Sequence, residues 1–179
     1  MEGMGLLFRQ RIRYRRGLWM KTGLIVSVYI LSVVLANLSA SYFGIWITPI
    51  NAFLLIGLEI TVRDLLHERI NHLQMIGIVL VAGILSYSIN IDTQNIAIAS
   101  LIAVTVSCLL DYAVFKRTKG SWLKKSNTSN IFSSASDSLL FPTIGFGTFN
   151  VGVVLLQFFL KLFGGFIWSL AINKFRNKF

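Results

Sequence analysis

Six stretches of mostly apolar sequence follow one another along this chain, each of about 20 residues and separated only by short connections. They cover approximately residues 22–43, 45–65, 73–91, 96–115, 130–146 and 151–173. A helix of about 20 apolar residues crosses the roughly 30 Å hydrocarbon core of a bilayer. We therefore predict an all-α integral membrane protein with six transmembrane helices, in which residues 1–179 form one domain and residues 1–21 are a basic tail.

The composition supports this class and excludes others. Apolar residues make up 55% of the 179 residues and charged residues only 13%, whereas soluble domains carry about 45–50% apolar and about 25% charged residues. A single cysteine, Cys108, and two histidines exclude an internal disulfide and a four-ligand zinc site. We expect no metal and no cofactor. No enzyme is predicted, because the sequence has neither a phosphate-binding glycine loop nor a serine with a histidine in reach.

The basic residues indicate the orientation in the membrane. Sixteen of the seventeen Lys and Arg residues lie in the two terminal tails or near residues 63–69 and 116–125. The alternate connections, near residues 44, 90–95 and 147–150, contain none. Because Lys and Arg are enriched in cytoplasmic loops, both termini are predicted to be cytoplasmic in a multi-pass protein of the cell (plasma or inner) membrane. The same placement accounts for the net charge of +10. We therefore expect the lipid bilayer, and no nucleic acid, as a partner of this chain.

Ionisable residues occur inside four of the predicted spans, among them the second and the fourth. Glu59 and Arg63 lie on one face of the second helix, and they either neutralise each other or face a solute; the spacing favours neither. Asp111, about one turn from the end of the fourth helix, either pairs with the basic loop after it or lines a site. Asp64 and Glu68 are expected in a solvated helix end and loop.

The fifth predicted span begins with a strongly polar run, ten of whose thirteen residues are polar. Asn130, Ser133, Ser134 and Asp137 share one helical face, and Pro142 removes a backbone hydrogen bond. Close packing of small residues accounts for the serines but less well for Asp137. We expect a broken, polar half-helix, which is a common way to build a binding site within a membrane.

Lys161, near the middle of the sixth span, requires a carboxylate partner, and Asp137 and Asp111 are the candidates. Glu59, Asp111 and Asp137 are each expected about one to two turns, roughly 5–10 Å, from the cytoplasmic surface. Three carboxylates at similar depth predict one shared polar cavity. Such groups suit a flat solute with several N–H donors, for example a guanine-like heterocycle; a cation or a polyol fits nearly as well.

Four short motifs occur in order along the chain: Ala36-Asn37, Leu58-Glu59-Ile-Thr-Val-Arg63-Asp64, Leu110-Asp111-Tyr-Ala-Val-Phe115 and Asn130-Ile-Phe-Ser-Ser-Ala-Ser136-Asp137-Ser138-Leu-Leu-Phe141. With them the sequence resembles the queuosine precursor transporter family, also called the putative vitamin uptake transporter (VUT) family. The resemblance implies a six-helix importer of 7-cyano-7-deazaguanine or 7-aminomethyl-7-deazaguanine, which are precursors in a tRNA modification pathway. Glu59 stands where many members of the family carry aspartate.

The residues and the resemblance together predict a substrate-binding site. Its members are Asn37, Glu59, Arg63, Asp111, Asn130, Ser133, Asp137, Ser138 and Lys161. One alternative is a substrate-binding subunit of an energy-coupling vitamin transporter, with that module or a second copy of the chain as partner. The other is a structural or pore-forming membrane protein that transports no specific solute.

Overall fold

The computed structural model describes the backbone of residues 2–175 and the side chains of residues 21–175, and this part of the chain is helical without a strand. The helices are α1 (Glu2–Phe43), α2 (Thr48–Asn51), α3 (Gly57–His67), α4 (His72–Ile89), α5 (Gln94–Arg117), α6 (Trp122–Phe146) and α7 (Val151–Phe175). A 3₁₀ turn, Gly44–Ile47, joins α1 to α2, and a π-helical turn, Ala52–Ile56, joins α2 to α3. The chain from α2 to α3 is therefore one continuous helical stretch.

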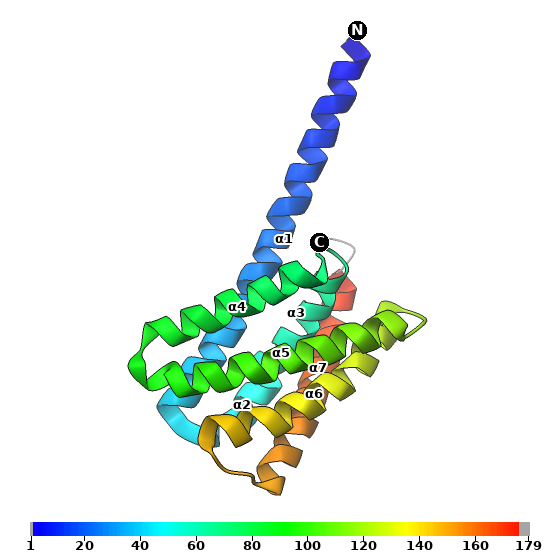
Figure 1. Ribbon diagram of the computed structural model, residues 1–179. Coiled ribbons are helices and arrows are strands. Elements are labelled where there is room, and N and C mark those ends of the chain that lie inside the picture. Colours follow the sequence, from blue (N-terminus) through cyan, green and yellow to red (C-terminus); the bar gives the residue numbers. More distant parts are fainter. Residues whose placement is uncertain (1, 176–179) are drawn as a thin grey trace.

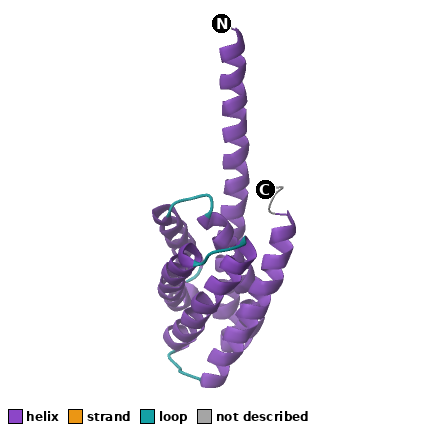
Figure 2. Cartoon of the chain, turned by 90° about the vertical axis from the view of Figure 1, so that its right-hand side faces the viewer, coloured by secondary structure: helices purple, strands orange, loops and turns teal. Residues whose placement is uncertain are grey.

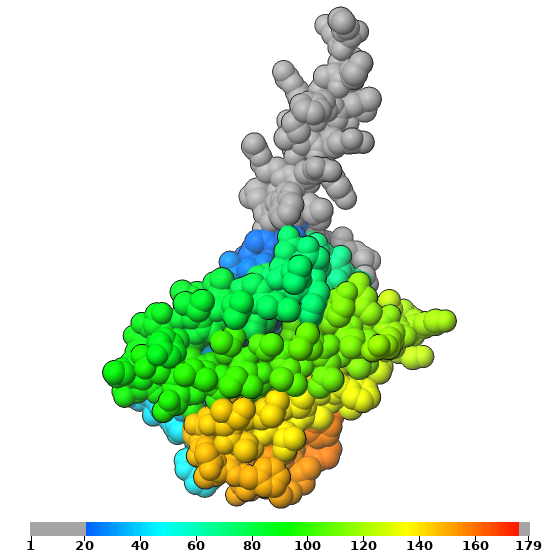
Figure 3. All heavy atoms as spheres, in the orientation of Figure 1, coloured from blue at the N-terminus to red at the C-terminus, as the bar shows by residue number. Residues whose placement is uncertain are grey.

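The helices are arranged in two layers (Figures 1 and 2). Helices α4, α5 and α6 lie side by side in one layer, and α1, the α2–α3 stretch and α7 lie behind them. Contacts lead from α1 to α4, α5, α6, α7, α3 and back to α1, so the helices form a closed ring around the interior. The space-filling view shows α4, α5 and α6 covering the front face (Figure 3). The N-terminus and the end of α7 lie on one side of the bundle, opposite the α6–α7 connection (Figure 1).

Four helical stretches in the described residues are long and apolar enough to cross a membrane. They are Lys21–His67, His72–Ile89, Ile91–Arg117 and Val151–Phe175. The first is 47 residues long because the chain stays helical through the turn between α1 and α2, and α6 is not among them because its first half is polar. The all-helical membrane class is confirmed, whereas the count of six spans and the cytoplasmic position of the termini stay predictions.

Helix α6 differs from the predicted fifth span in two respects. It begins at Trp122 rather than near residue 130, and the hydroxyl of Ser121 caps it by accepting a hydrogen bond at 3.3 Å from a backbone N–H in the first turn. It also continues through Pro142 to Phe146, and it is followed by Gly147, whose φ of +64° lies in the left-handed region. The prediction of a broken half-helix is wrong. A proline removes one backbone hydrogen bond, and packing against the neighbouring helices holds the segment in place.

Helix α7 packs very closely against the π-helical turn and α3. A Cβ at Gly164 would collide with the carbonyl oxygen of Phe53, and a Cβ at Gly57 would lie 2.8 Å from the backbone of Gly164. Trp168 Nε1 donates to the carbonyl oxygen of Leu54 at 3.1 Å, so α7 also provides a partner for the backbone of the π-helical turn. Small residues allow helices in membranes to pack this closely.

Polar and apolar residues fill different parts of the interior. The apolar core surrounds Tyr29, Leu66 and Met75, between α1, α3, α4 and α5. Polar side chains fill the space between α3, α5, α6 and α7. Large apolar side chains, such as Phe159 and Phe163 of α7, are exposed on the outside. This is the distribution expected of a bundle surrounded by lipid.

Candidate functional site

A column of buried polar side chains runs through the bundle between α3, α5, α6 and α7. Its ionisable members in the described residues are Glu59, Asp64, Asp111, Asp137, Arg63, Lys161 and His67, all of them buried. Charges in a membrane interior are costly unless they are paired or serve a function. The contacts within this polar column therefore indicate what it can do.

Arg63 of α3 is the centre of a first cluster. Its Nη1 donates to Ser107 Oγ on α5 at 2.8 Å, while its Nε lies 3.6 Å from Asp111 Oδ2 and 3.9 Å from Glu59 Oε1. The Glu59–Arg63 pair is thus present, but the contact to Asp111 is the shorter one. Neither Nε nor Nη2 has a hydrogen-bond partner among the described residues, so the guanidinium keeps buried donors available.

Asp111 points into the bundle and not toward the basic loop after α5. Its Oδ2 faces Arg63 and also lies 3.1 Å from His67 Nε2. The side chain of Asp111 is fully buried. The alternative in which Asp111 pairs with the basic loop is therefore wrong, because the face of α5 that carries Asp111 and Ser107 is turned toward α3. The ring of His67 packs against that of Tyr112, with centroids 5.5 Å apart.

The expectation that Asp64 lies in a solvated helix end is wrong. Its carboxylate is fully buried and accepts hydrogen bonds from Ser126 Oγ at 2.5 Å and Ser129 Oγ at 3.2 Å. Both serines lie in the first turns of α6, ahead of the predicted fifth span. Because α6 starts early, its polar beginning covers the end of α3 and excludes solvent. Glu68, the other acid expected there, is exposed as predicted.

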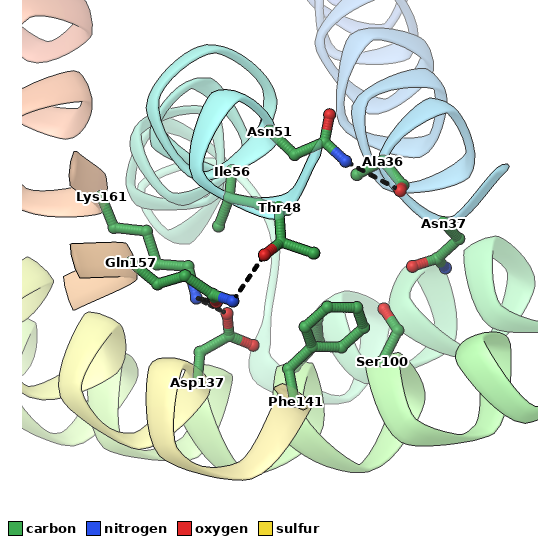
Figure 4. Close-up of a pocket in the computed structure, with 11 residues that line it drawn as sticks. Ala36, Asn37, Thr48, Asn51, Ile56, Ser100, Asp137, Phe141, Gln157 and Lys161 are labelled. Atoms are coloured by element: carbon green, nitrogen blue, oxygen red, sulfur yellow. Dashed lines mark hydrogen bonds and ion pairs between the residues drawn. The ribbon is translucent and has the colours of Figure 1, made fainter. Parts of the chain in front are cut away.

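Lys161 of α7 is the centre of a second cluster (Figure 4). Its Nζ donates to Asp137 Oδ2 at 2.6 Å, to Ser138 Oγ at 3.1 Å and to Gln157 Oε1 at 3.2 Å. These bonds use all three hydrogens of the ammonium group. Gln157 Nε2 in turn donates to Thr48 Oγ1 at 2.9 Å. Asp137 is thus the predicted carboxylate partner of Lys161, and the cluster connects α7 to α6 and α2.

A small pocket lies beside the Lys161 cluster. It is lined by Ala36, Asn37, Thr48, Asn51, Ile56, Ser100, Val104, Asp137, Phe141, Gln157 and Lys161. Figure 4 shows the ring of Phe141 between Asp137 and Ser100. Asn37 Nδ2 donates to Ser86 Oγ of α4 at 3.0 Å, which connects the pocket to the far edge of the bundle. The cavity volume of about 20 Å³ has room for about one water molecule.

The three predicted site carboxylates do not lie at one depth. Asp111 lies six residues, roughly 9 Å of helix rise, before the end of α5. Asp137 lies fifteen residues, roughly 22 Å, beyond the start of α6, and the short 118–121 connection places those two helix ends next to each other. A single shared cavity is therefore not formed. The early start of α6 moves Asp137 away from Glu59 and Asp111 and into the Lys161 cluster.

Asn130, Ser133 and Ser134 of α6 lie along the polar column between its two clusters. The amide nitrogen and oxygen of Asn130 and the hydroxyl of Ser134 are buried and have no hydrogen-bond partner among the described residues. Ser133 Oγ makes only a long bond of 3.5 Å, to the carbonyl oxygen of Asn130. Unpaired polar groups at this depth are costly, so the column is incomplete here. All nine predicted site residues are buried, and their contact with a solute stays a prediction.

The predicted set of site residues omits several members of the polar column, among them Thr48, Asp64, His67 and Gln157. Gln157 precedes Lys161 by four residues, a spacing that places both on one helical face. His67 follows Arg63 by four residues in the same way, but it lies beyond the predicted end of the span. Thr48 carries no such signal, because its role depends on how α2 packs against α7.

Membrane-length apolar helices around a buried, charged column are typical of membrane transporters. The chain belongs to the putative vitamin uptake transporter family, whose family model matches residues 11–173. This membership confirms the family predicted from the four motifs. No curated protein and no solved structure matches the chain.

Proposed function

We propose that this protein imports a queuosine precursor, 7-cyano-7-deazaguanine or 7-aminomethyl-7-deazaguanine, across the cell membrane through the polar column. The proposal includes six spans with both termini in the cytoplasm. The observation that carries it is Asn130, whose amide donor and acceptor are both buried and unpartnered. A solute that brings its own donors and acceptors would complete the column at this point.

The chemistry of the column supports a flat nitrogen heterocycle. A guanine-like edge presents a ring N–H and an exocyclic amine side by side, and one carboxylate accepts both. Glu59 and Asp137 are acids of the column that could accept these two N–H groups, and the amide of Asn130 donates to the carbonyl of the heterocycle. The ring of Phe141 lines the pocket and offers a face for stacking.

The small pocket supports an alternating-access mechanism. Its volume of about 20 Å³ is too small for a heterocycle, since a single water molecule fills it. Solute loading therefore requires the helices around Phe141 to separate. We interpret the described conformation as a closed state, in which Lys161 donates to both Asp137 and Gln157.

The test uses a strain that cannot make the precursor and is given this gene with a low external concentration of 7-cyano-7-deazaguanine. Queuosine is expected to appear in its tRNA. Asn130→Leu, which keeps the shape of the side chain but removes both polar atoms, is expected to abolish queuosine formation. The matched control is Ser136→Ala on the same helix, since the Ser136 hydroxyl bonds within α6, to the carbonyl oxygen of Ser133. No queuosine with the wild-type gene, despite correct membrane insertion, would overturn the proposal.

A second candidate is a substrate-binding subunit of an energy-coupling vitamin transporter, since the family description names vitamin uptake. The two candidates differ in what the purified chain does alone. Uptake by proteoliposomes that contain only this chain supports the importer, whereas a requirement for co-purified ATPases supports the subunit. Binding of guanine, its 7-deaza analogues and a vitamin panel, measured side by side, identifies the solute. Absence of any saturable binding would support the structural or pore-forming alternative.

A further inference from the structure

Two buried carboxyl groups meet where α3 and α5 face the start of α6. Asp64 and Asp111 are both fully buried. Asp111 faces the turn of α3 that carries Asp64, because its Oδ2 lies 3.6 Å from Arg63 Nε and 3.1 Å from His67 Nε2. Asp64 is held by the hydroxyls of Ser126 and Ser129. Asp111 Oδ1 has no hydrogen-bond partner among the described residues. Two carboxylates in contact repel each other unless one of them carries a proton.

The surrounding charges do not remove this repulsion. The titratable and charged groups near the pair are Glu59, Arg63 and His67 on α3, Cys108 and Tyr112 on α5, His72 on α4 and Tyr29 on α1. Arg63 is the permanent cation of this group, and its ion pairs are with Glu59 and Asp111. No ion pair to Asp64 is formed by the described residues. One proton between Asp64 and Asp111 therefore fits the geometry better than two ionised acids.

We propose that Asp64 and Asp111 share one exchangeable proton, that His67 relays this proton, and that its movement is coupled to the import of the solute. This inference rests on the proposed function and adds the driving force: the protein is a proton symporter. The proton arrives from a hydronium ion, which leaves as water. It forms an O–H bond on the Asp64–Asp111 pair, passes to His67 Nε2 and is released to water.

The position of His67 supports the relay. Its Nε2 lies 3.1 Å from Asp111 Oδ2, and it is the last residue of α3. In the other direction, Arg63 connects Asp111 to Ser107, and the same face of α5 continues to Ser100 at the pocket. The proton site thus lies between the pocket and the end of α3 that carries His67. The solute and the proton therefore use the same polar column.

The test uses the full chain in proteoliposomes with labelled 7-cyano-7-deazaguanine. Counterflow without a pH gradient measures carrier activity alone. Net uptake with the outside one pH unit more acidic, and the membrane potential clamped at zero, measures coupling. One proton for each solute molecule gives roughly tenfold accumulation. Counterflow without any accumulation would overturn proton coupling and leave the proposed function intact.

Three variants assign the proton site. Asp64→Asn is expected to lose the tenfold accumulation while counterflow stays detectable, because the amide hydrogen-bonds like the protonated acid but releases no proton. His67→Gln is expected to slow the response to the gradient. Glu68→Gln removes an exposed acid at the same end of α3 and is expected to behave like wild type. Full accumulation by Asp64→Asn would overturn the assignment of the proton to this pair.

An infrared measurement on the purified chain tests the shared proton without any solute. The difference spectrum between wild type and Asp64→Asn at neutral pH is expected to contain a protonated carboxylic acid C=O band, and that between wild type and Glu68→Gln is expected to lack it. Absence of the band would overturn the shared proton, and its presence supports it. Failure of wild-type counterflow with every heterocycle tested would overturn the proposed function, and the infrared result would still decide on the proton.

Discussion

Neutralising Asp137 separates the structural role of the Lys161 cluster from its role in transport. Among the described residues, Asp137 is the only carboxylate within ion-pair distance of Lys161, at 2.6 Å. Asp137→Asn removes it and leaves a buried ammonium group with Gln157 and Ser138 as neutral acceptors. Breaking a buried ion pair from one side costs about 3–5 kcal/mol. For a chain of this size that lowers the melting temperature by roughly 6–20 °C. The assay is thermal unfolding of the purified protein in detergent.

A second substitution completes this experiment. Asp137→Asn combined with Lys161→Met removes both charges, and replacing a buried pair by apolar groups is often neutral. The double variant is expected to recover most of the lost stability but no solute uptake, whereas Asp92→Asn, at an exposed acid in the α4–α5 connection, changes neither. A melting temperature of Asp137→Asn equal to that of wild type would refute the role of the ion pair. Normal uptake by the double variant would remove the cluster from the binding site.

Three further changes test other parts of the structure. Gly164→Ala places a methyl group against the carbonyl oxygen of Phe53 and is expected to reduce the amount of folded protein, measured by size-exclusion chromatography. Gly77→Ala, whose new Cβ has open space around it, is expected to leave the amount of folded protein unchanged. Asn130→Leu removes two unpartnered buried atoms and is expected to raise the free energy of unfolding by about 1–3 kcal/mol while solute binding is lost; a destabilised protein would contradict the unpaired state of this amide. Trp168→Phe deletes the bond to the carbonyl oxygen of Leu54 and is expected to cost about 1 kcal/mol, checked by thermal unfolding.

The fold class and much of the candidate site are predictable from local sequence. Runs of apolar residues determine which segments are helical in lipid, and the helical repeat places Glu59 with Arg63, and Asn130 with Asp137, on single faces. The cost of burying charge then predicts that such residues point inward. These arguments use only neighbours along one helix. They therefore cannot decide whether Asp137 or Asp111, each on another helix, is the partner of Lys161.

Sequence by itself determined that this chain is a helical membrane protein with a charged interior, because both properties follow from composition and periodicity within single segments. The tertiary structure decided which charges meet. Asp64 is buried because the first turns of α6 cover it, and Asp137 lies apart from Asp111 because α6 starts at Trp122. Thr48 reaches Gln157 only through the packing of α2 against α7. Such contacts depend on the relative rotation and depth of separate helices, which no spacing within one helix specifies.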